Sequence, residues 1–277
     1  MPEIPEVEAF KSYCTAHCLR KPIVDIKIVD ASAIQQPSST VFKKALLDHT
    51  FTSVERLGKY LIIHVSNSDE KLVMHFGLTG SLFYTADKDE RVPFSRVQFI
   101  FKNGILHWTC IRKFGKLWLV EDLQSITGLK KLGFDALTIT KKQFLQLLSD
   151  NEQKNIKAFL MDQDIIAGIG NEYSDEALFQ AGIDPRHSVK DLSDSMRQEL
   201  YTMLHKVLLY AIKIQKKNSE TASGPHLLSN EARESFAASY LQAHRHIDMV
   251  CPKNKNHALK KATIAGRTTY YCPIDQK

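Results

Sequence analysis

The chain has 277 residues, of which 43% are hydrophobic and 25% charged, and it carries a net charge of +6. This length allows two ordinary domains with a sizeable core. No apolar run approaches the length of a bilayer span, and the acidic residues near the start do not read as a signal peptide, so we expect a cytoplasmic protein without a membrane partner.

The positive charge is concentrated at the carboxyl end of the chain. From residue 244 onward only Asp248 and Asp275 oppose a set of basic residues, which are Arg245, Lys253, Lys255, Lys260, Lys261, Arg267 and Lys277. Such a segment indicates phosphate contacts, and a solvated surface is the plain alternative. The five cysteines are an odd number, which argues against a disulfide framework.

The first half of the chain combines one helix with many short strands. Residues 5–19 have apolar positions at helical spacing, and residues 24–28 alternate as a half-buried strand does. Further short apolar runs follow at 60–65, 72–75, 97–101, 105–108 and 117–120. This pattern predicts a helix followed by a β-sandwich or barrel.

The pattern becomes helical near residue 136. We expect a helix capped by Thr140, a second over about 155–162, a third over 171–180 that stops at Gly182, and a longer one through 196–211. A mobile loop is expected over 217–230 and a β-hairpin around 263–271. The fold class is therefore α+β, with domains at 1–135, 136–243 and 244–277.

The first residues carry a candidate nucleophile. If Met1 is removed, Pro2 presents a secondary amine, and an α-amino group with a pKa of roughly 7.7–8.0 is partly unprotonated at neutral pH. Such an amine attacks an electrophilic carbon and forms a Schiff base, while Glu3 and Glu6 lie close enough in sequence to move protons. A helix start with acids favoured by the dipole explains the same residues without catalysis.

Several internal segments each allow a functional and a structural interpretation. Lys59 follows a glycine in a turn, and residues 75–82 contain two glycines typical of a tight loop. Arg112 and Phe114 place a cation and an aromatic ring two residues apart, a pair suited to filling the gap left by an extruded base. An exposed turn lysine, an ordinary hairpin and a sheet edge are the structural alternatives.

A glycine-punctuated turn at residues 161–173 joins two helices. Asn171 is expected to cap the second helix, and free amides at such a start bind phosphate well. Arg267 adds a cation on the terminal hairpin. The alternative is a helix–turn–helix that packs without a ligand.

The terminal cysteines suggest a zinc site that is incomplete. Cys251 and Cys272 stand where paired Cys-x-x-Cys motifs would begin, but Asn254 is a poor ligand and Asp275 an uncertain one. His257 offers a substitute that no spacing rule predicts. We therefore expect a hairpin with two buried thiols and no metal.

Together these segments resemble the formamidopyrimidine-DNA glycosylase (Fpg) family, in a superfamily shared with endonuclease VIII. The resemblance covers nearly the whole chain and rests on residues 2–8, 58–61 and 167–171 in the expected order. It implies a bifunctional glycosylase and abasic-site lyase of base excision repair that removes oxidised purines such as 8-oxoguanine and formamidopyrimidines. It also implies a monomer that binds damaged double-stranded DNA in the cytoplasm, at the nucleoid.

The resemblance implies a role for each matched residue. Pro2 would be the Schiff-base nucleophile at C1′, Glu3 the general acid, Glu6 its support and Lys59 a phosphate and sugar contact. The residues matched to DNA contacts are Leu78, Arg112 and Phe114 in the duplex void, and Lys157, Asn171 and Arg267 on phosphates.

This chain departs from the family pattern at four places. Leu78 replaces a methionine, Lys113 an arginine, Cys110 with Ile111 an Asp-Pro pair, and two zinc-finger cysteines are missing. The change at Cys110 and Ile111 leaves the turn geometry open. The loss of two cysteines puts the stability of the zinc finger in doubt.

Two other functions compete with this one. An endonuclease VIII-like enzyme for oxidised pyrimidines is disfavoured by Ile4 and by the wedge of Arg112 and Phe114. A lesion-binding protein without catalysis is disfavoured because the chain retains a full set of candidate catalytic residues, which are Pro2, Glu3, Glu6 and Lys59.

Overall fold

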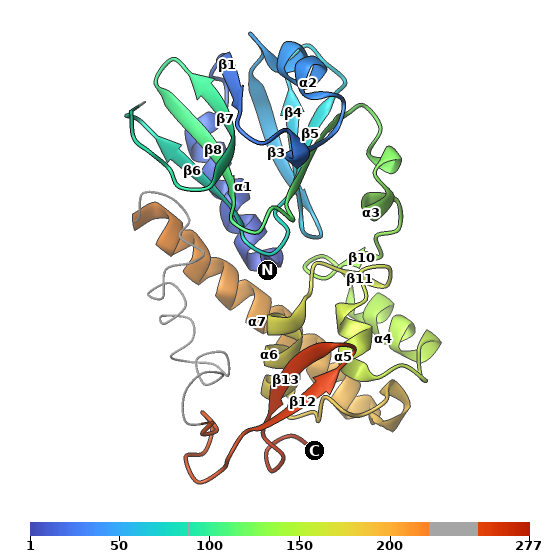
Figure 1. The fold of residues 1–277 in the computed structure, drawn as a ribbon. Helices are drawn as coiled ribbons and strands as arrows, with labels where there is room; N and C mark the ends of the chain where they lie inside the picture. Colours follow the sequence, from blue (N-terminus) through green and yellow to red (C-terminus); the bar gives the residue numbers. More distant parts are fainter. Residues whose placement is uncertain (88, 222–248) are drawn as a thin grey trace. The chain divides into compact units, whose positions relative to one another are not determined.

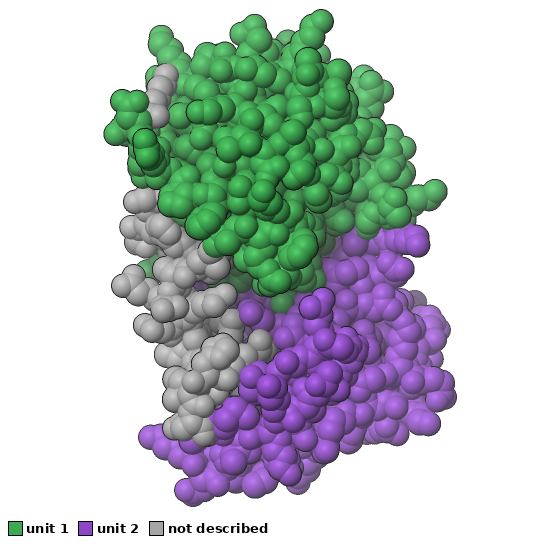
Figure 2. Space-filling view, in the orientation of Figure 1, with its two compact units in different colours: residues 1–130, 215–227 green, residues 131–214, 228–277 purple. Residues whose placement is uncertain are grey.

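The computed structural model describes residues 1–87, 89–221 and 249–277, with backbone only for 218–221. The described residues divide into two compact units (Figures 1 and 2). Unit 1 holds residues 1–130 and the end of a long helix from Gln215, and unit 2 holds 131–214 with the described terminal segment. The limits of the three domains expected from the sequence stay a prediction. Among the described helices, none is both long and apolar enough to cross a membrane.

Unit 1 begins with the helix predicted from the sequence. Helix α1 (Ile4–Cys18) has Pro5 in its first turn, where a missing N–H is harmless. Its first seven residues are all buried, and the ring of Phe10 lies 4.2 Å from that of Phe76. The first two turns of α1 are therefore enclosed by the core, whereas its second half has exposed positions such as Thr15 and Ala16.

Two sheets complete unit 1. The four-stranded sheet has the order β1 (Ile23–Ile28), β7 (Ser95–Phe101), β8 (Gly104–Cys110) and β6 (Gly80–Thr85). The five-stranded sheet has the order β2 (Ile34–Gln36), β9 (Lys116–Val120), β5 (Lys71–His75), β4 (Tyr60–Val65) and β3 (Phe51–Leu57). One apolar cluster joins α1 to both sheets, which confirms the predicted helix and β-sandwich.

The sequence patterns placed six strands of unit 1 correctly. The alternating residues 24–28 and the apolar runs around β4, β5, β7, β8 and β9 are strands, as predicted. Among the strands and the longer helices of unit 1, the patterns missed β2, β3, β6 and α2 (Ser39–Leu46). β3 is buried only at intervals, and α2 turns just Phe42 and Leu46 inward, so neither has a continuous apolar signal.

Unit 2 contains the helices expected in the second half of the chain. They are α4 (Lys141–Asp150), α5 (Ile156–Met161), α6 (Asn171–Ala181) and α7 (Asp194–Thr221). Unit 2 also contains short elements, which are β10 (Phe134–Asp135), β11 (Ile166–Ala167) and the 3-10 helix η3 (Val189–Asp191). The short elements of unit 1 are the 3-10 helices η1 (Ala31–Ala33) and η2 (Leu123–Ser125) and the helix α3 (Thr127–Lys130). The hairpin pairs β12 (Lys260–Ile264) with β13 (Arg267–Tyr271), as predicted.

The helix signals were partly right. Thr140 caps α4 by accepting the N–H of Gln143, and Gly182 ends α6 in the left-handed conformation at φ 71°. Asn171 does not cap α6, because Gly170 holds the N-cap position. The loop expected from residue 217 does not begin there, since α7 continues to Thr221; residues 222–230 of that loop lie outside the described part of the chain.

A buried ion pair fixes α1 to the five-stranded sheet. Arg56 on β3 donates through Nε to Oε1 of Glu8 at 2.8 Å, and the two side chains are only 4% and 10% exposed. Arg56 also donates through Nη1 to the carbonyl of Gly58 at 3.0 Å. One guanidinium therefore holds both the helix and the turn that follows β3.

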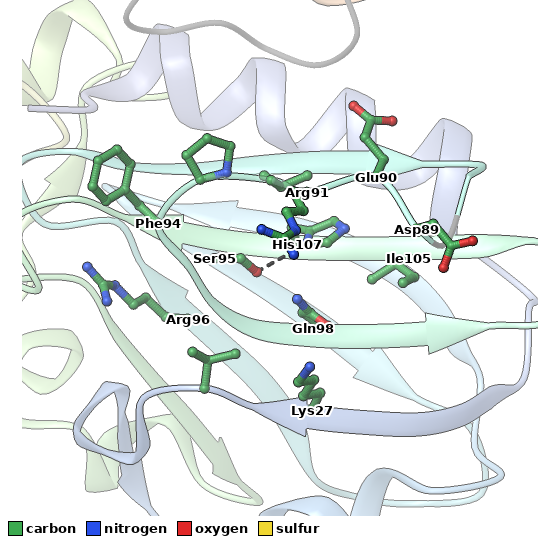
Figure 3. Close-up of a pocket in the computed structure, with 13 residues that line it drawn as sticks. Lys27, Asp89, Glu90, Arg91, Phe94, Ser95, Arg96, Gln98, Ile105 and His107 are labelled. Atoms are coloured by element: carbon green, nitrogen blue, oxygen red, sulfur yellow. Dashed lines mark hydrogen bonds between the residues drawn. The ribbon is translucent and has the colours of Figure 1, made fainter.

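Burial makes two histidines of unit 1 poor bases. Burial lowers the pKa of His107 from 6.5 to about 4, and burial with the nearby charge of Lys59 does the same to His75. Nδ1 of the neutral His107 ring lies 3.1 Å from the hydroxyl of Ser95 (Figure 3), and Nε2 lies 3.1 Å from the hydroxyl of Thr85. In the neutral ring one hydroxyl can donate to the bare nitrogen while the other accepts from the N–H, so both ring nitrogens have partners.

The first prediction concerns the ion pair. Arg56→Met should lower the free energy of unfolding by about 3 kcal/mol, because Glu8 is left buried without its partner. This value is at the low end of the range for breaking a buried ion pair, because Nζ of Lys11 also lies 3.7 Å from Oε2 of Glu8 and keeps a cation near it. Denaturant unfolding measures the change. Lys43→Met, which breaks an exposed pair with Asp25, is the control and should cost under about 1 kcal/mol. Equal losses in both variants would contradict the argument.

The second prediction concerns acid stability. The unfolded chain binds protons at both histidines near pH 6.5, whereas the folded chain does so only near pH 4. The free energy of unfolding should therefore be unaffected by these groups above pH 6.5 and fall as the pH drops from 6.5 towards 4. Denaturant titrations at several pH values test this, and His107→Gln should make the fall shallower. An unchanged slope in that variant would exclude His107 as a source.

Candidate active site and DNA-contacting residues

The start of α1 holds the two acids predicted for catalysis. Glu3 occupies the N-cap position and is 1% exposed, while Glu6 is 7% exposed. Oε2 of Glu6 accepts the backbone N–H of Glu3 at 2.9 Å, and Oε1 accepts from the Gln215 side chain at 3.2 Å. Pro2 is buried immediately before them. Both carboxylates are thus held in place beside the residue expected to be the nucleophile.

Lys59 lies in a two-residue turn between β3 and β4. Gly58 has a φ of 56°, and Leu57 pairs with Tyr60, a geometry that suits glycine at the first position of a type II′ hairpin turn. The side chain of Lys59 is 6% exposed. Its charge helps to lower the pKa of His75, so the ammonium lies near the end of β5. The structure places Lys59 in the same unit as Pro2, Glu3 and Glu6.

Two adjoining loops carry the three residues predicted to fill the duplex void. A Cβ on Gly77 would meet the backbone of Phe114 at 2.5 Å, so the loop of Leu78 packs directly on the loop of Phe114. The N–H of Arg112 donates to Oγ1 of Thr79 at 2.9 Å. Leu78 is half-buried, whereas Phe114 is 55% exposed and lies 5.4 Å below the guanidinium of Arg112.

The departure at Cys110 is explained by this loop. The buried Sγ of Cys110 accepts the N–H of Gly115 at 3.3 Å, which closes the turn between β8 and β9. Lys113 adopts a φ of 58° and forms a 3.1 Å ion pair with Asp30. A hydrogen bond from Ser32 and this lysine hold the pKa of Asp30 at about 2. Arg112 and Phe114 therefore project from a loop that is anchored on both sides.

Lys157 does not lie on the surface of unit 2. Its side chain is fully buried, and its Nζ donates to Oδ1 of Asn171 at 2.8 Å, to Oδ1 of Asp175 at 2.6 Å and to Oγ1 of Thr269 at 2.5 Å. These three acceptors come from α6 and β13, whereas Lys157 is on α5. The geometry makes Lys157 a positioning residue for Asn171 and for the hairpin that carries Arg267. A direct contact between Lys157 and phosphate stays a prediction.

Asn171 and Arg267 are brought to neighbouring places by this network. The amide of Asn171 donates to the carbonyl of Thr268 at 3.1 Å, directly after the exposed Arg267. Ala265 and Gly266 both have positive φ, which matches a type I′ turn and places Arg267 at the first position of β13. The start of α6 and the hairpin cation thus meet within unit 2.

Some residues that shape the site carried no role in the sequence argument. Asp175 lies one helical turn after Asn171, a spacing that places both on one face and is readable from the sequence. Gln163 orders the turn before α6, since its side chain bonds to Met161, Gly168 and Ile169. The partnership of Glu8 with Arg56 joins residues 48 positions apart and has no local signal.

The terminal hairpin contains a group of potential metal ligands. Within the described residues, donor atoms of Cys251, Cys272 and Asp275 all lie within 4.8 Å of one another. From the sequence we expected two buried thiols without a metal, and Asp275 as an uncertain ligand.

Comparison with known proteins is consistent across sequence and structure. The family model of the formamidopyrimidine-DNA glycosylase N-terminal domain matches residues 1–117, and that of its H2TH domain matches 132–223. The curated formamidopyrimidine-DNA glycosylases of Pelotomaculum thermopropionicum and Ureaplasma parvum are each 32% identical to this chain. They cover 100% and 99% of it, and the match spans 99% and 98% of their own lengths.

A solved complex of Lactococcus lactis Fpg with DNA containing an abasic site has a TM-score of 0.83 and 26% identity, and it covers 99% of each chain. Another complex of the same organism's Fpg contains an oxidised pyrimidine, with a TM-score of 0.83 and 25% identity over 100% of each chain. These matches extend over both units. The chain therefore belongs to the formamidopyrimidine-DNA glycosylase family.

Proposed function

We propose that this protein is a DNA glycosylase and abasic-site lyase that acts on oxidised bases in double-stranded DNA. The observation that carries the proposal is the fixed arrangement of Pro2, Glu3 and Glu6 at the start of α1. The same Arg56 that binds this helix also holds the carbonyl of Gly58, directly before Lys59. Full-length similarity to Fpg proteins supports it. We also propose that the protein works as a monomer in the cytoplasm, at the nucleoid. The bacterial relatives support the cytoplasmic part of this location.

The proposed chemistry begins after removal of Met1. The amine of Pro2 attacks C1′ of the damaged nucleotide, and the bond from C1′ to the base breaks with the base leaving protonated. The sugar ring opens to an iminium that joins the Pro2 nitrogen to C1′. Two eliminations then release the 3′ and 5′ phosphates in turn, and water frees the enzyme.

Glu3 is assigned the proton transfers because it lies next to Pro2 and is almost entirely enclosed. Glu6 holds the backbone of Glu3 through the 2.9 Å bond and so fixes the position of that acid. Lys59 is assigned a phosphate and sugar contact near the lesion. A lysine at the tip of a rigid turn loses little conformational freedom when it binds, which favours this assignment.

Unit 1 also supplies the residues proposed to fill the space of the extruded base. Leu78 offers an apolar side chain, while Phe114 offers an exposed ring and Arg112 a cation above it. Extruding a base costs a few kcal/mol, and inserted side chains offset part of that cost. In unit 2, Asn171 and Arg267 are proposed to bind phosphate, and Lys157 to hold them in register.

The preferred lesion is proposed to be an oxidised purine. Ile4 at the start of α1 and the wedge of Arg112 and Phe114 favour this class. The complex of Lactococcus lactis Fpg with an oxidised pyrimidine supports oxidised pyrimidines as a second candidate class for this chain. Parallel assays on 8-oxoguanine and oxidised-pyrimidine duplexes separate the two.

The third prediction tests the nucleophile. Wild-type protein whose mass confirms loss of Met1 should form a covalent adduct with an 8-oxoguanine duplex in borohydride, because reduction traps the iminium. Pro2→Gly should trap at least about tenfold less, and Glu3→Gln should lose base excision. Pro5→Ala, at a buried proline of the same helix start, is the matched control and should trap normally. Wild-type protein that forms no adduct on oxidised or abasic duplexes would instead be a lesion-binding protein.

The fourth prediction tests the packing of the two loops. Gly77→Ala should weaken binding to lesion-containing duplex by about tenfold, because alanine at a φ of 58° costs about 1–2 kcal/mol and its Cβ displaces the backbone of Phe114. Gly182→Ala carries a similar φ of 71° with its nearest atom at 3.4 Å, and it should leave DNA binding unchanged. Competition binding measures both, and equal losses would show that strain alone is responsible.

A further inference from the structure

The loop that carries the wedge is supported from inside unit 1. This wedge loop, residues 111–115, connects β8 to β9. Its middle residue, Lys113, forms the 3.1 Å ion pair with Asp30. Arg112 and Phe114 stand on either side of Lys113, and both side chains are exposed. The ion pair therefore acts on the backbone between the two wedge residues, whereas their side chains remain on the surface.

Asp30 is oriented to receive this lysine. It occupies the N-cap position of η1, where its Oδ1 accepts the Ser32 N–H at 3.2 Å and the Ser32 hydroxyl at 2.7 Å. Its other oxygen, Oδ2, faces two cations, with Nζ of Lys113 at 3.1 Å and Nη1 of Arg96 at 3.9 Å. The bonds from Ser32 and the ion pair hold the pKa of Asp30 at about 2, so the carboxylate is ionised at neutral pH.

Arg96 joins this carboxylate to the start of the wedge loop. It is the second residue of β7, next to Ser95 (Figure 3). Its Nε donates to the carbonyl of Cys110 at 2.9 Å, and its Nη2 donates to the carbonyl of Ile111 at 3.5 Å. Its own carbonyl accepts the N–H of Asp30 at 3.1 Å. One residue therefore fixes both the start of the loop and the position of the carboxylate that holds its middle.

The end of the loop is attached to the same turn. Nζ of Lys116, the first residue of β9, donates to the carbonyl of Ser32 at 3.0 Å. These two residues are 84 positions apart, and they meet because η1 leads into β2, which pairs with β9. We call Asp30, Ser32 and Arg96 the wedge dock. The dock contacts the loop at its start and middle and the strand at its end, and it therefore restricts the path of the loop.

A wedge held in this way has a defined position against the base opposite the lesion. Side chains that fill the space of an extruded base lie against the base that has lost its partner. A hydrogen bond weakens steeply when its atoms are out of place, so a shift of the wedge by about 1 Å changes which opposite base it contacts well. The dock sets this position, because it fixes the backbone from which Arg112 and Phe114 project.

We infer that Asp30, Ser32 and Arg96 are positioning residues that set the opposite-base specificity of the enzyme through the wedge loop rather than through contact with DNA. The inference rests on the proposed function, because that function assigns the wedge to the space of the extruded base. Exposed ion pairs contribute little on their own. Here the Lys113 side chain is 59% exposed, but that of Asp30 is only 15% exposed and is tied to both other residues of the dock.

The fifth prediction compares duplexes that differ only in the base opposite the lesion. Affinities are measured for duplexes that carry a tetrahydrofuran site, a stable abasic analogue, opposite each of the four bases, since this binding needs no chemistry. Wild-type protein should bind the four with unequal affinities. Asp30→Asn should reduce the ratio of the best to the worst by about fivefold, because Lys113 loses its anchor. Single-turnover excision of 8-oxoguanine opposite the same bases should show the same loss.

Three further variants separate positioning from charge and from folding. Ser32→Ala removes a bond to Asp30 without a change of charge and should reduce the ratio by about twofold. Lys113→Arg keeps the cation and should retain the wild-type ratio. Asp25→Asn is the matched control, because it removes the same charge from the exposed pair with Lys43 and should also retain the ratio.

The outcomes distinguish this inference from the proposed function. A uniform change in the affinity of Asp30→Asn for all four duplexes would show that Asp30 acts only through its charge or through folding, and it would overturn the inference. A wild-type ratio in Asp30→Asn, or equal affinities of the wild type for all four duplexes, would do the same. Wild-type protein that excises no oxidised base, but whose ratio falls in Asp30→Asn, would contradict the proposed chemistry and support the dock.

Discussion

The buried pair of Glu8 and Arg56 is the interaction on which the proposed active site depends. It joins α1, which carries Pro2 and the two acids, to the strand that leads into Lys59. The same guanidinium also holds the carbonyl of Gly58, so helix and turn share one anchor. A charge removed from water must be paired to be tolerated, and here the pairing connects parts of the chain that carry the proposed catalytic groups. The sandwich then encloses this anchor in a single core.

In unit 2 a buried charge must likewise be paired, and here the pairing holds α6 and β13 together. Lys157 is a fully buried ammonium whose acceptors lie on α6 and β13, so its charge requires those elements to stay together. Asn171 and Arg267 are presented as a result. The proposed phosphate contacts would then rest on a rigid frame, which lowers the entropy lost on binding DNA.

The departures from the family pattern are local replacements rather than losses. Cys110 closes the wedge loop through its sulfur, and Lys113 pairs with Asp30 while Arg112 and Phe114 remain exposed. At the terminal hairpin, Asp275 lies 2.9 Å from Nδ1 of His257 and 3.1 Å from the sulfur atoms of Cys251 and Cys272. In each case the new side chain supplies an acceptor or a charge at the required point, so the loop keeps its path although the residue type has changed.

The sequence by itself determined the elements whose signals are local. The buried helix at the start, six strands, the Thr140 cap, the Gly182 stop and the hairpin all follow from period, capping and turn chemistry within a few residues. The order of several characteristic motifs also determined the family. Only the tertiary structure decided which residues meet: Glu8 with Arg56, Lys157 with Asp175 and Thr269, and Asp275 with His257 and two cysteines. These partners lie up to 112 positions apart, and no local preference encodes such pairs, because they form only when the packing of whole helices and sheets brings them within a bond length.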